Sequence, residues 1–444
     1  MTSSAPSAAD GERLLRRSVW PILWVAVAYC TLVTRDLDVG PVPAKFFLTV
    51  VALATWVAYR WWSRAWVGLP WVPQTILFAI GVPALGIAVA AVRAHAHDPS
   101  QPSGLHDAAV EGSRFVYIAL LVPLADWTRS LRSEREVNRI WLYPVLVLAL
   151  LTIGLYILHV AGFAFSASGN LGPFQGDIGV DATTGWFRAF MVTDVLFIPA
   201  VVLVFTRLYS SWRRRFDWIA LAVLTVAVWL AHTRGIWLGI LIGCATCLLL
   251  RLVLECPRTR PLLFAAAAVT PLVVLAVAVP TLARPLVNWA TGGMAELSAS
   301  VRLVQTPKLL AGVQRHLAFG SGLGSVLPSG YQRDPQDPWS FEMAYLQLLF
   351  ELGVIGILLL AWLPVSAFLS GTKRLLRRPS GTDGAVTMAI AGIGCLTALL
   401  ISFADNPYLI TSPGTLALAI SCAMCGAIMT AGSRMTDMPS TVGD

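Results

Sequence analysis

The chain has 444 residues, of which 57% are hydrophobic and only 13% are charged, and its mean hydropathy is +0.71. Soluble domains carry about 25% charged residues, so this composition excludes a soluble protein. Apolar runs close to the roughly 20 residues that cross a bilayer recur from Val19 to Thr430. We therefore expect one integral membrane domain over residues 1–444, without a cleavable signal peptide.

The net charge of +8 does not indicate nucleic-acid binding, because the arginines form short clusters between the apolar runs. The seven cysteines lie almost entirely inside or beside these runs, including the two C-x-x-C pairs Cys244/Cys247 and Cys422/Cys425. A disulfide framework is not expected, and small apolar core residues are the simpler interpretation.

The run pattern predicts an all-α fold, a polytopic transmembrane helical bundle of about twelve spans. The expected spans are 19–34, 42–59, 67–92, 109–127, 140–162, 186–206, 218–232, 235–254, 262–282, 343–369, 385–404 and 413–432. Alternate loops carry most of the basic residues, so the positive-inside rule places those loops and both termini in the cytoplasm. This alternation requires a chain break at Thr233-Arg234-Gly235, between two closely joined spans.

The segment 283–342 precedes the tenth span and falls on the extracytoplasmic side of this topology. Loops longer than about 15 residues are usually functional or disordered. Its apolar residues, Val301 to Leu317, alternate with Arg302, Lys308 and Arg315, which predicts an amphipathic helix on the membrane surface. Pro307 is expected to bend or interrupt that helix.

Arg234 and Arg302 are the first candidate functional residues. An ionisable group at a membrane boundary is a functional candidate by default, although Arg234 placed at the headgroups for solvation alone is the competing interpretation. Gly320-Ser321-Gly322-Leu323-Gly324 follows, and glycines permit close backbone approach to an anionic ligand. A tight turn without a ligand is the alternative, and no strand precedes it as in a dinucleotide fingerprint.

Glu342 opens the tenth span and is followed by Tyr345. A carboxylate there either stabilises the helix N-terminus or acts as a general base toward a hydroxyl, and the residues alone leave both readings open. The loop with His95, His97 and His106 fits no standard metal-site spacing, so no metal site is expected. Glu111 and Arg114 lie three residues apart, where mutual neutralisation explains them.

In order and spacing, these blocks resemble the C-terminal half of the O-antigen ligase and O-antigen polymerase superfamily of bacterial membrane glycosyltransferases. The resemblance covers roughly residues 185–365. It rests on Thr233-Arg234-Gly235-Ile236-Trp237-Leu238, Arg302 in the long segment, the Gly320–Gly324 turn, and the Leu-rich helix that ends in Gly353 and Gly356.

The resemblance implies a metal-independent, inverting glycosyltransferase without a cofactor, in the bacterial cytoplasmic membrane. Its donor would be a glycan on undecaprenyl diphosphate, and its acceptor a glycan or lipid-linked hydroxyl at the extracytoplasmic face. Arg234 and Arg302 would hold the diphosphate, with Arg188 as a third basic residue and Glu342 as the base. Arg315, Gly322, Gly324 and Tyr345 complete the expected substrate-binding set.

Ligases of the superfamily typically carry a histidine where this chain has Glu342. His316 precedes the glycine turn and does not match, so the acidic residue favours a polymerase of surface polysaccharide repeat units over a ligase. A ligase acting on lipid A-core, a protein or a wall polymer is the alternative reading. A flippase for the same lipid-linked glycan is a further alternative, which the apolar mid-span positions disfavour.

Overall fold

The computed structural model describes residues 8–33, 38–39, 42–63, 71–95, 104–130, 138–163, 176–180, 187–210, 215–231, 233–255, 297–327, 341–377 and 384–427. Over these residues the protein is mostly helical, as expected, with two small two-stranded sheets. The first half comprises α1 (Ala8–Leu32), β1 (Asp38–Val39), β2 (Val42–Pro43), α2 (Ala44–Ser63), α3 (Val72–Ile76), η1 (Leu77–Gly81), α4 (Val82–His95), α5 (Leu105–Ser113), η2 (Val116–Leu120), α6 (Leu121–Ser130), η3 (Asn138–Leu142), α8 (Tyr143–Val160), β3 (Gly176–Val180) and β4 (Phe187–Met191).

The second half is built from longer helices. It comprises η4 (Val192–Leu196), α9 (Phe197–Ser210), α10 (Arg215–Ala231), α11 (Arg234–Glu255), α13 (Leu297–Arg315), α14 (Ala344–Arg377), α15 (Gly384–Asp405), η6 (Pro407–Ile410) and α16 (Ser412–Gly426).

Seven helical segments of the described chain are long and apolar enough to cross a membrane, as expected of an integral membrane protein. They are Val72–His95, Leu105–Thr128, Ile140–Val160, Val192–Ser210, Arg234–Glu255, Ala344–Arg377 and Gly384–Ala404. Helices also cover the expected spans near α1, α2, α10 and α16, whereas the expected span 262–282 lies outside the described residues. The total of about twelve spans stays a prediction.

The sixth expected span begins later than residue 186, because its first residues form strand β4. β4 pairs antiparallel with β3, with Gly176 opposite Met191 and Val180 opposite Phe187. The helix begins at Val192, where the Asp194 carboxylate accepts a 2.8 Å hydrogen bond from the Met191 amide. A carboxylate in the first turn satisfies an amide that has no partner within the helix, and this contact fixes the boundary.

The predicted break before Arg234 lies between α10, which ends at Ala231, and α11, which begins at Arg234. The Trp237 indole donates a 2.8 Å hydrogen bond back to the Val228 carbonyl, and it stacks on Trp229 with ring centroids 5.0 Å apart. These contacts hold the end of α10 against the first turn of α11.

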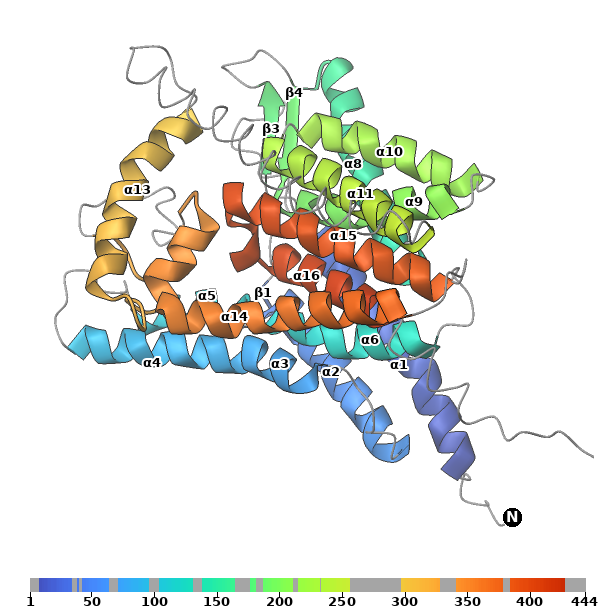
Figure 1. Ribbon diagram of the computed structural model, residues 1–444, viewed down its shortest axis with the longest axis horizontal. Coiled ribbons are helices and arrows are strands. Elements are labelled where there is room, and N and C mark those ends of the chain that lie inside the picture. Colours follow the sequence, from blue (N-terminus) through green and yellow to red (C-terminus); the bar gives the residue numbers. More distant parts are fainter. Residues whose placement is uncertain are drawn as a thin grey trace, which may run out of the picture.

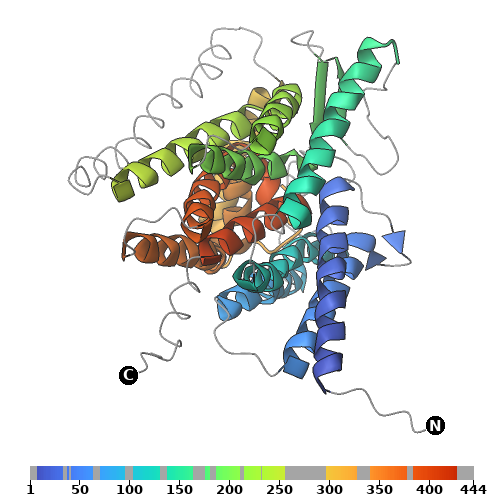
Figure 2. The same ribbon diagram turned by 90° about the vertical axis from the view of Figure 1, so that its right-hand side faces the viewer.

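Most of the helices run along the long axis of the molecule, whereas α13 lies across one end of them (Figure 1). The same end holds the start of α11, the start of α14, and the ends of α4 and α15 (Figure 1). In the view turned by 90°, α1 and α8 flank the bundle on one side (Figure 2). The crosswise direction of α13 is the one expected of a helix on a membrane surface, since the other helices would run along the membrane normal.

Pro307 lies inside α13 without interrupting it, so of the two expected effects the interruption is wrong, while the bend stays a prediction. The helix is held by the start of α14. The Thr306 hydroxyl donates a 2.6 Å hydrogen bond to the Arg302 carbonyl and lies 3.6 Å from the Met343 sulfur. A Cβ at Gly312 would lie 2.4 Å from the Phe350 ring.

Helices α11 and α15 pack with their backbones in contact, through a stripe of small residues. Gly235, Gly239 and Gly243 recur every four residues on α11 and therefore share one face. The Gly235 carbonyl accepts a 2.7 Å hydrogen bond from Ser402 of α15, and a Cβ at Gly239 would lie 2.6 Å from the Ala398 carbonyl oxygen. This small-residue packing fixes the start of α11 relative to α15.

Helix α14 breaks at Gly353, whose φ of 63° and ψ of −172° are not helical. The break divides α14 into a short first part that packs on α13 and a long second part that crosses the bundle (Figure 1). A helix break leaves carbonyls and amides without helical partners, and these need other hydrogen bonds when they are buried.

Candidate functional site

Arg302 and Glu342 are the two predicted site residues that the structure joins directly. An Arg302 guanidinium nitrogen lies 3.8 Å from a Glu342 carboxylate oxygen. The side chains are 25% and 12% exposed, so the pair lies at the surface of the site and not in the core. A partly exposed ion pair at this distance contributes about 0–1 kcal/mol, and an incoming anion can therefore displace Glu342 from Arg302.

Two buried glutamines position the backbone that carries Glu342. Gln305 of α13 accepts a 3.0 Å hydrogen bond from the Glu342 amide, and Gln347 of α14 accepts a 3.1 Å bond from the Phe341 amide. Both glutamine side chains are fully buried. Because Gln305 follows Arg302 by three residues, the two side chains leave the same face of α13. The Arg302–Glu342 pair is thus supported from both helices.

Gln347 also connects Glu342's segment to two buried carboxylates. Its amide nitrogen lies 3.1 Å from an oxygen of Glu111 and 3.1 Å from an oxygen of Glu351. The second Glu111 oxygen accepts a 2.6 Å hydrogen bond from the Gly324 amide. Glu111 therefore contacts residues of the site region far along the chain, a role beyond the neutralisation of Arg114 that the sequence suggested.

The glycine turn packs against the break in α14 and against α4 and α5. Gly320, Gly322 and Gly324 all have positive φ angles, of 73°, 99° and 72°. A Cβ at Gly322 would lie 2.5 Å from the Ala90 backbone, and one at Gly324 would lie 2.8 Å from the Ala108 amide nitrogen. Only glycine combines these angles with such close backbone contact.

The backbone of this turn is hydrogen-bonded to the protein. Four amides of the turn donate to acceptors in the fold: Ser321 to the Phe350 carbonyl, Gly322 to the Glu351 carbonyl, Leu323 to the Gly86 carbonyl and Gly324 to the Glu111 carboxylate. In return, Val354 and Ile355 donate to the carbonyls of Leu317 and Ala318. These contacts give the glycines a packing role, and the turn supplies the partners that the α14 break requires.

Arg234 is an exposed first residue of α11, and the small-residue stripe sets its position. The connection to Glu342 runs through α15: Ser402 contacts Gly235, and the Leu400 carbonyl accepts a short hydrogen bond from the Tyr345 hydroxyl. Arg234 and the Arg302–Glu342 pair therefore lie on elements that meet at one end of the bundle (Figure 1).

Arg188 lies on β4 at the same end. Its guanidinium carbon is 4.9 Å from the centroid of the Phe190 ring, within the range of a cation–π interaction. Phe190 in turn contacts the Tyr408 ring, with centroids 6.3 Å apart, just beyond the end of α15. These contacts hold a second arginine near the terminus of α15, next to the elements that carry Arg234.

Arg315 is placed apart from the Arg302–Glu342 pair. It is exposed in the last turn of α13, about 20 Å from Arg302 along the helix axis at the usual helical rise. The neighbouring His316 ring nitrogen contacts Arg93 of α4 at 3.2 Å. Because a guanidinium only donates hydrogen bonds, this His316 nitrogen is the acceptor. Arg315 thus lies near the end of α13 that is farther from the Arg302–Glu342 pair.

Within the described residues, no group of three or more metal-ligating side chains is found. His97 lies outside the described residues, and His95 contacts the backbone carbonyl of Ala91. None of the cysteines in the described part of the chain forms a disulfide.

Sequence reasoning missed three features of this site. Gln305 gave no signal, because one buried glutamine on an amphipathic helix looks like any other polar residue. Glu111 could only be connected to the site through the fold. The glycine stripe of α11 was visible as a repeated G-x-x-x-G pattern, which is a known signature of close helix packing in membranes.

Comparison with known families and proteins gave one match. Residues 219–361 match the model of a family described as O-Antigen ligase. The matched range contains Arg234, Arg302, Glu342 and Tyr345, and it ends after the α14 break. No curated protein and no solved structure matches the chain. The match confirms the resemblance drawn from the sequence blocks.

Proposed function

Because residues 219–361 match the family described as O-Antigen ligase, we propose that the protein transfers a glycan from undecaprenyl diphosphate to an acceptor hydroxyl, without a metal or other cofactor. The matched family supports a glycosyltransferase-type membrane enzyme with lipid-linked glycan substrates. The residues at one end of the bundle support the more specific donor and acceptor.

The Arg302–Glu342 pair is the observation that carries the proposal. In the transfer, the acceptor oxygen forms a bond to the anomeric carbon of the donor, and the bond from that carbon to the diphosphate breaks. Glu342 takes the proton of the acceptor hydroxyl, and the diphosphate leaves with the bonding electrons. Direct displacement inverts the anomeric carbon.

Arg302 and Arg234 bind the diphosphate and stabilise the charge that grows on it as the bond breaks. Arginine suits this role because its planar fork can donate two parallel hydrogen bonds to phosphate oxygens. The Arg302–Glu342 ion pair is long and partly exposed, so it is weak enough to be displaced. When Arg302 turns to the diphosphate, the Glu342 carboxylate is released toward the acceptor, so donor binding prepares the base.

We favour polymerisation of repeat units over ligation because an acidic residue stands where superfamily ligases typically have histidine. The acceptor is then the sugar hydroxyl of a second lipid-linked repeat unit. Ligation to lipid A-core, a protein or a wall polymer would use the same donor chemistry. The reaction is assigned to the extracytoplasmic face of the bacterial cytoplasmic membrane, with both termini in the cytoplasm, on the distribution of basic loops.

The test measures polymer formed from lipid-linked repeat units in membranes that contain Arg234→Ala, Arg302→Ala or Glu342→Gln. Loss of one arginine is expected to lower the rate about 10²–10³-fold, the usual effect of removing a donor that stabilises developing charge. Loss of the base is expected to lower it about 10²–10⁴-fold. Arg302→Lys should recover only part of the loss, because an ammonium lacks the guanidinium fork.

Lys308→Ala is the matched control, since it removes one positive charge from the same helix α13. It should retain most of the activity. Wild-type polymer lengths with all three site variants would refute the site. Transfer to lipid A-core or protein in place of polymer would assign the protein as a ligase. Movement of lipid-linked glycan across proteoliposomes without new glycosidic bonds would instead assign a flippase.

A further inference from the structure

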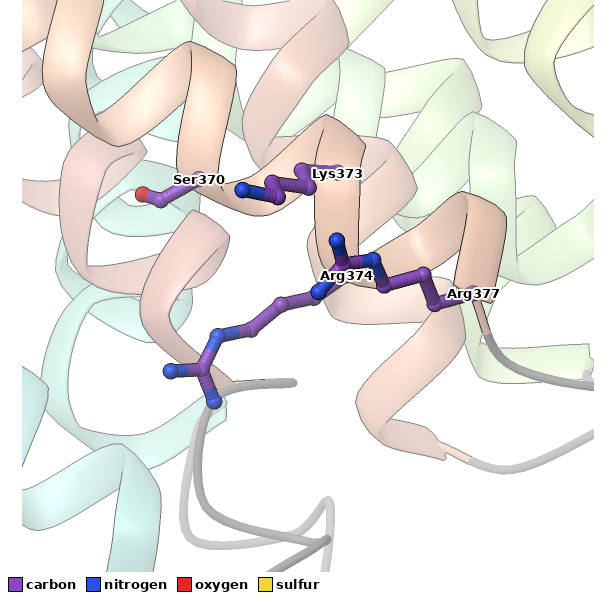
Figure 3. Close-up of a pocket in the computed structure, with 4 residues that line it drawn as sticks. All are labelled: Ser370, Lys373, Arg374 and Arg377. Atoms are coloured by element: carbon purple, nitrogen blue, oxygen red, sulfur yellow. The ribbon is translucent and has the colours of Figure 1, made fainter.

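A pocket of about 450 Å³ lies at the other end of α14, away from the candidate site. The described residues that line it are Ser370, Lys373, Arg374 and Arg377. All three cationic side chains are exposed, and they extend from α14 toward the same side (Figure 3). Three positive charges around one cavity, with no acidic residue among its described lining, make a site for an anion.

Basic residues in the last turn of a helix are partly explained by the helix dipole, which favours positive charge at the C-terminus. The dipole effect falls off within that last turn, whereas Lys373 and Ser370 lie one and four residues before Arg374, the first basic residue of the last turn. The helix dipole also does not explain why these side chains surround a cavity. The dipole alone therefore does not account for the lining.

The surface that leads to the pocket identifies the kind of ligand. Leu358, Trp362, Val365 and Leu369 are 64%, 51%, 50% and 60% exposed, and their spacing of four, three and four residues places them on one face of α14. Lys373 follows Leu369 by four residues and continues this face. The opposite face, which includes Leu363 and Ala367, is buried in the bundle.

The length of this exposed apolar face matches one leaflet of a bilayer. Leu358 and Leu369 are separated by about 17 Å at the helical rise. One leaflet contributes about 15 Å of hydrocarbon, half of the usual core thickness. With the apolar face against acyl chains, the pocket lies at the depth of the lipid phosphates.

We propose that this pocket binds the phosphate of an anionic phospholipid, whose acyl chains lie along the exposed face of α14. Lys373, Arg374 and Arg377 contact the headgroup, while Leu369 and Val365 contact the chains. Long basic side chains near a helix end reach the headgroup region while their stems remain in apolar surroundings. The attraction of each basic residue to an anionic leaflet is appreciable, so three together give a clear preference over a zwitterionic lipid.

The test uses the full-length protein, purified in detergent and analysed by native mass spectrometry with added phosphatidylglycerol or phosphatidylcholine of the same acyl chains. The wild type is expected to retain phosphatidylglycerol about tenfold more strongly, a conservative figure for three basic residues near a surface. The triple variant Lys373→Gln, Arg374→Gln, Arg377→Gln should lose this preference. The single variant Lys373→Gln should lose part of it, which provides a milder change if the triple variant does not fold.

The matched control is the triple variant Arg213→Gln, Arg214→Gln, Arg215→Gln, which removes the same charge from another basic cluster. It should keep the preference. Leu369→Asn should weaken the retention of both lipids and leave the ratio of the two retentions unchanged. Equal retention of the two lipids by the wild type, or equal loss in the control, would overturn the proposal. Displacement by undecaprenyl phosphate or by inorganic phosphate at lower concentration than by phosphatidylglycerol would assign the pocket to those ligands and overturn it too.

Discussion

At the residue scale, the support of Glu342 by Gln305 is as informative as Glu342 itself. The Gln305 side-chain oxygen accepts a hydrogen bond from the Glu342 amide, and this hydrogen bond fixes the orientation of the Gln305 carboxamide. Its nitrogen finds no hydrogen-bond partner within the described residues. An unpaired buried donor costs about 1–3 kcal/mol. We propose that this nitrogen donates to the Glu342 carboxylate when the carboxylate leaves Arg302.

Gln305→Leu is therefore expected to lower the turnover rate of glycan transfer by at least about tenfold, because it removes the equivalent of one charge-assisted hydrogen bond. The Michaelis constant for the donor should change little, because Arg234 and Arg302 remain. The measurement is the separate determination of the turnover rate and of the Michaelis constant. Gln314→Leu, at an exposed position of the same helix, serves as the control. Equal kinetics for both variants would show that Gln305 only packs.

The glycine turn gives a second prediction for single residues. Gly322→Ala would place a Cβ 2.5 Å from the Ala90 backbone at a φ of 99°, so we expect a destabilisation of at least about 1–3 kcal/mol or failure to fold. Thermal unfolding in detergent, followed by circular dichroism, measures this. Gly154→Ala in α8 is the control, because a Cβ there meets nothing within 4 Å and alanine favours helices. A melting temperature for Gly322→Ala equal to that of the control would contradict the packing role.

At the scale of elements, the small-residue contact between α11 and α15 determines where Arg234 lies. Gly239→Leu would push against Ser402 and the Ala398 backbone, and the helices would have to separate. We expect transfer activity to fall at least about tenfold, since a displacement of about 1 Å near reacting groups costs up to 10²-fold. The assay is transfer at saturating substrate, with protein amounts matched by immunoblot.

Gly371→Ala is the control for Gly239→Leu, because its Cβ would meet Cys425 at 3.4 Å, an ordinary contact. Its activity should remain close to that of the wild type. If Gly239→Leu is as active as Gly371→Ala, the position of Arg234 does not depend on this contact.

The sequence predicted most helices because apolar runs of membrane length are a strong signal that does not depend on tertiary contacts. The break before Arg234 followed from charge alternation alone. Strand β4 was missed because a short apolar run reads equally well as the start of a span. The break at Gly353 was also missed, since it exists only where the turn before it supplies hydrogen-bond partners.

Of the site, the sequence predicted the charged residues but not their supports. Arg302 and Glu342 were identified by residue type and position, and the structure brings them within 3.8 Å. Gln305 and Glu111 act across 37 and 213 residues of the chain, a separation that no local pattern reveals.

At the scale of the whole molecule, the two ends of the bundle differ in their proposed ligands. One end holds α13 and the starts of α11 and α14, the elements that position Arg234, Arg302 and Glu342, and the other holds the end of α14 (Figure 1). The basic pocket lies at that end of α14 (Figure 3). By the positive-inside rule we expect the first end on the extracytoplasmic side and the second in the cytoplasm.

This orientation predicts the labelling of introduced cysteines by a membrane-impermeant maleimide. In spheroplasts, Lys308→Cys should react at once, whereas Lys373→Cys should react only after the membrane is permeabilised. The unmodified protein measures the background from native cysteines, most of which are buried in the described structure. The reverse pattern would invert the topology and place the proposed transfer in the cytoplasm.

The reciprocal backbone hydrogen bonds between the glycine turn and the α14 break constrain the number of residues in both segments. Ser321 and Gly322 donate to Phe350 and Glu351, while Leu317 and Ala318 accept from Val354 and Ile355. One inserted or deleted residue between Leu317 and Gly322 would misalign every pair, whatever the side chains. Related proteins that keep this arrangement are therefore expected to conserve the number of residues in these two stretches more strictly than their identity.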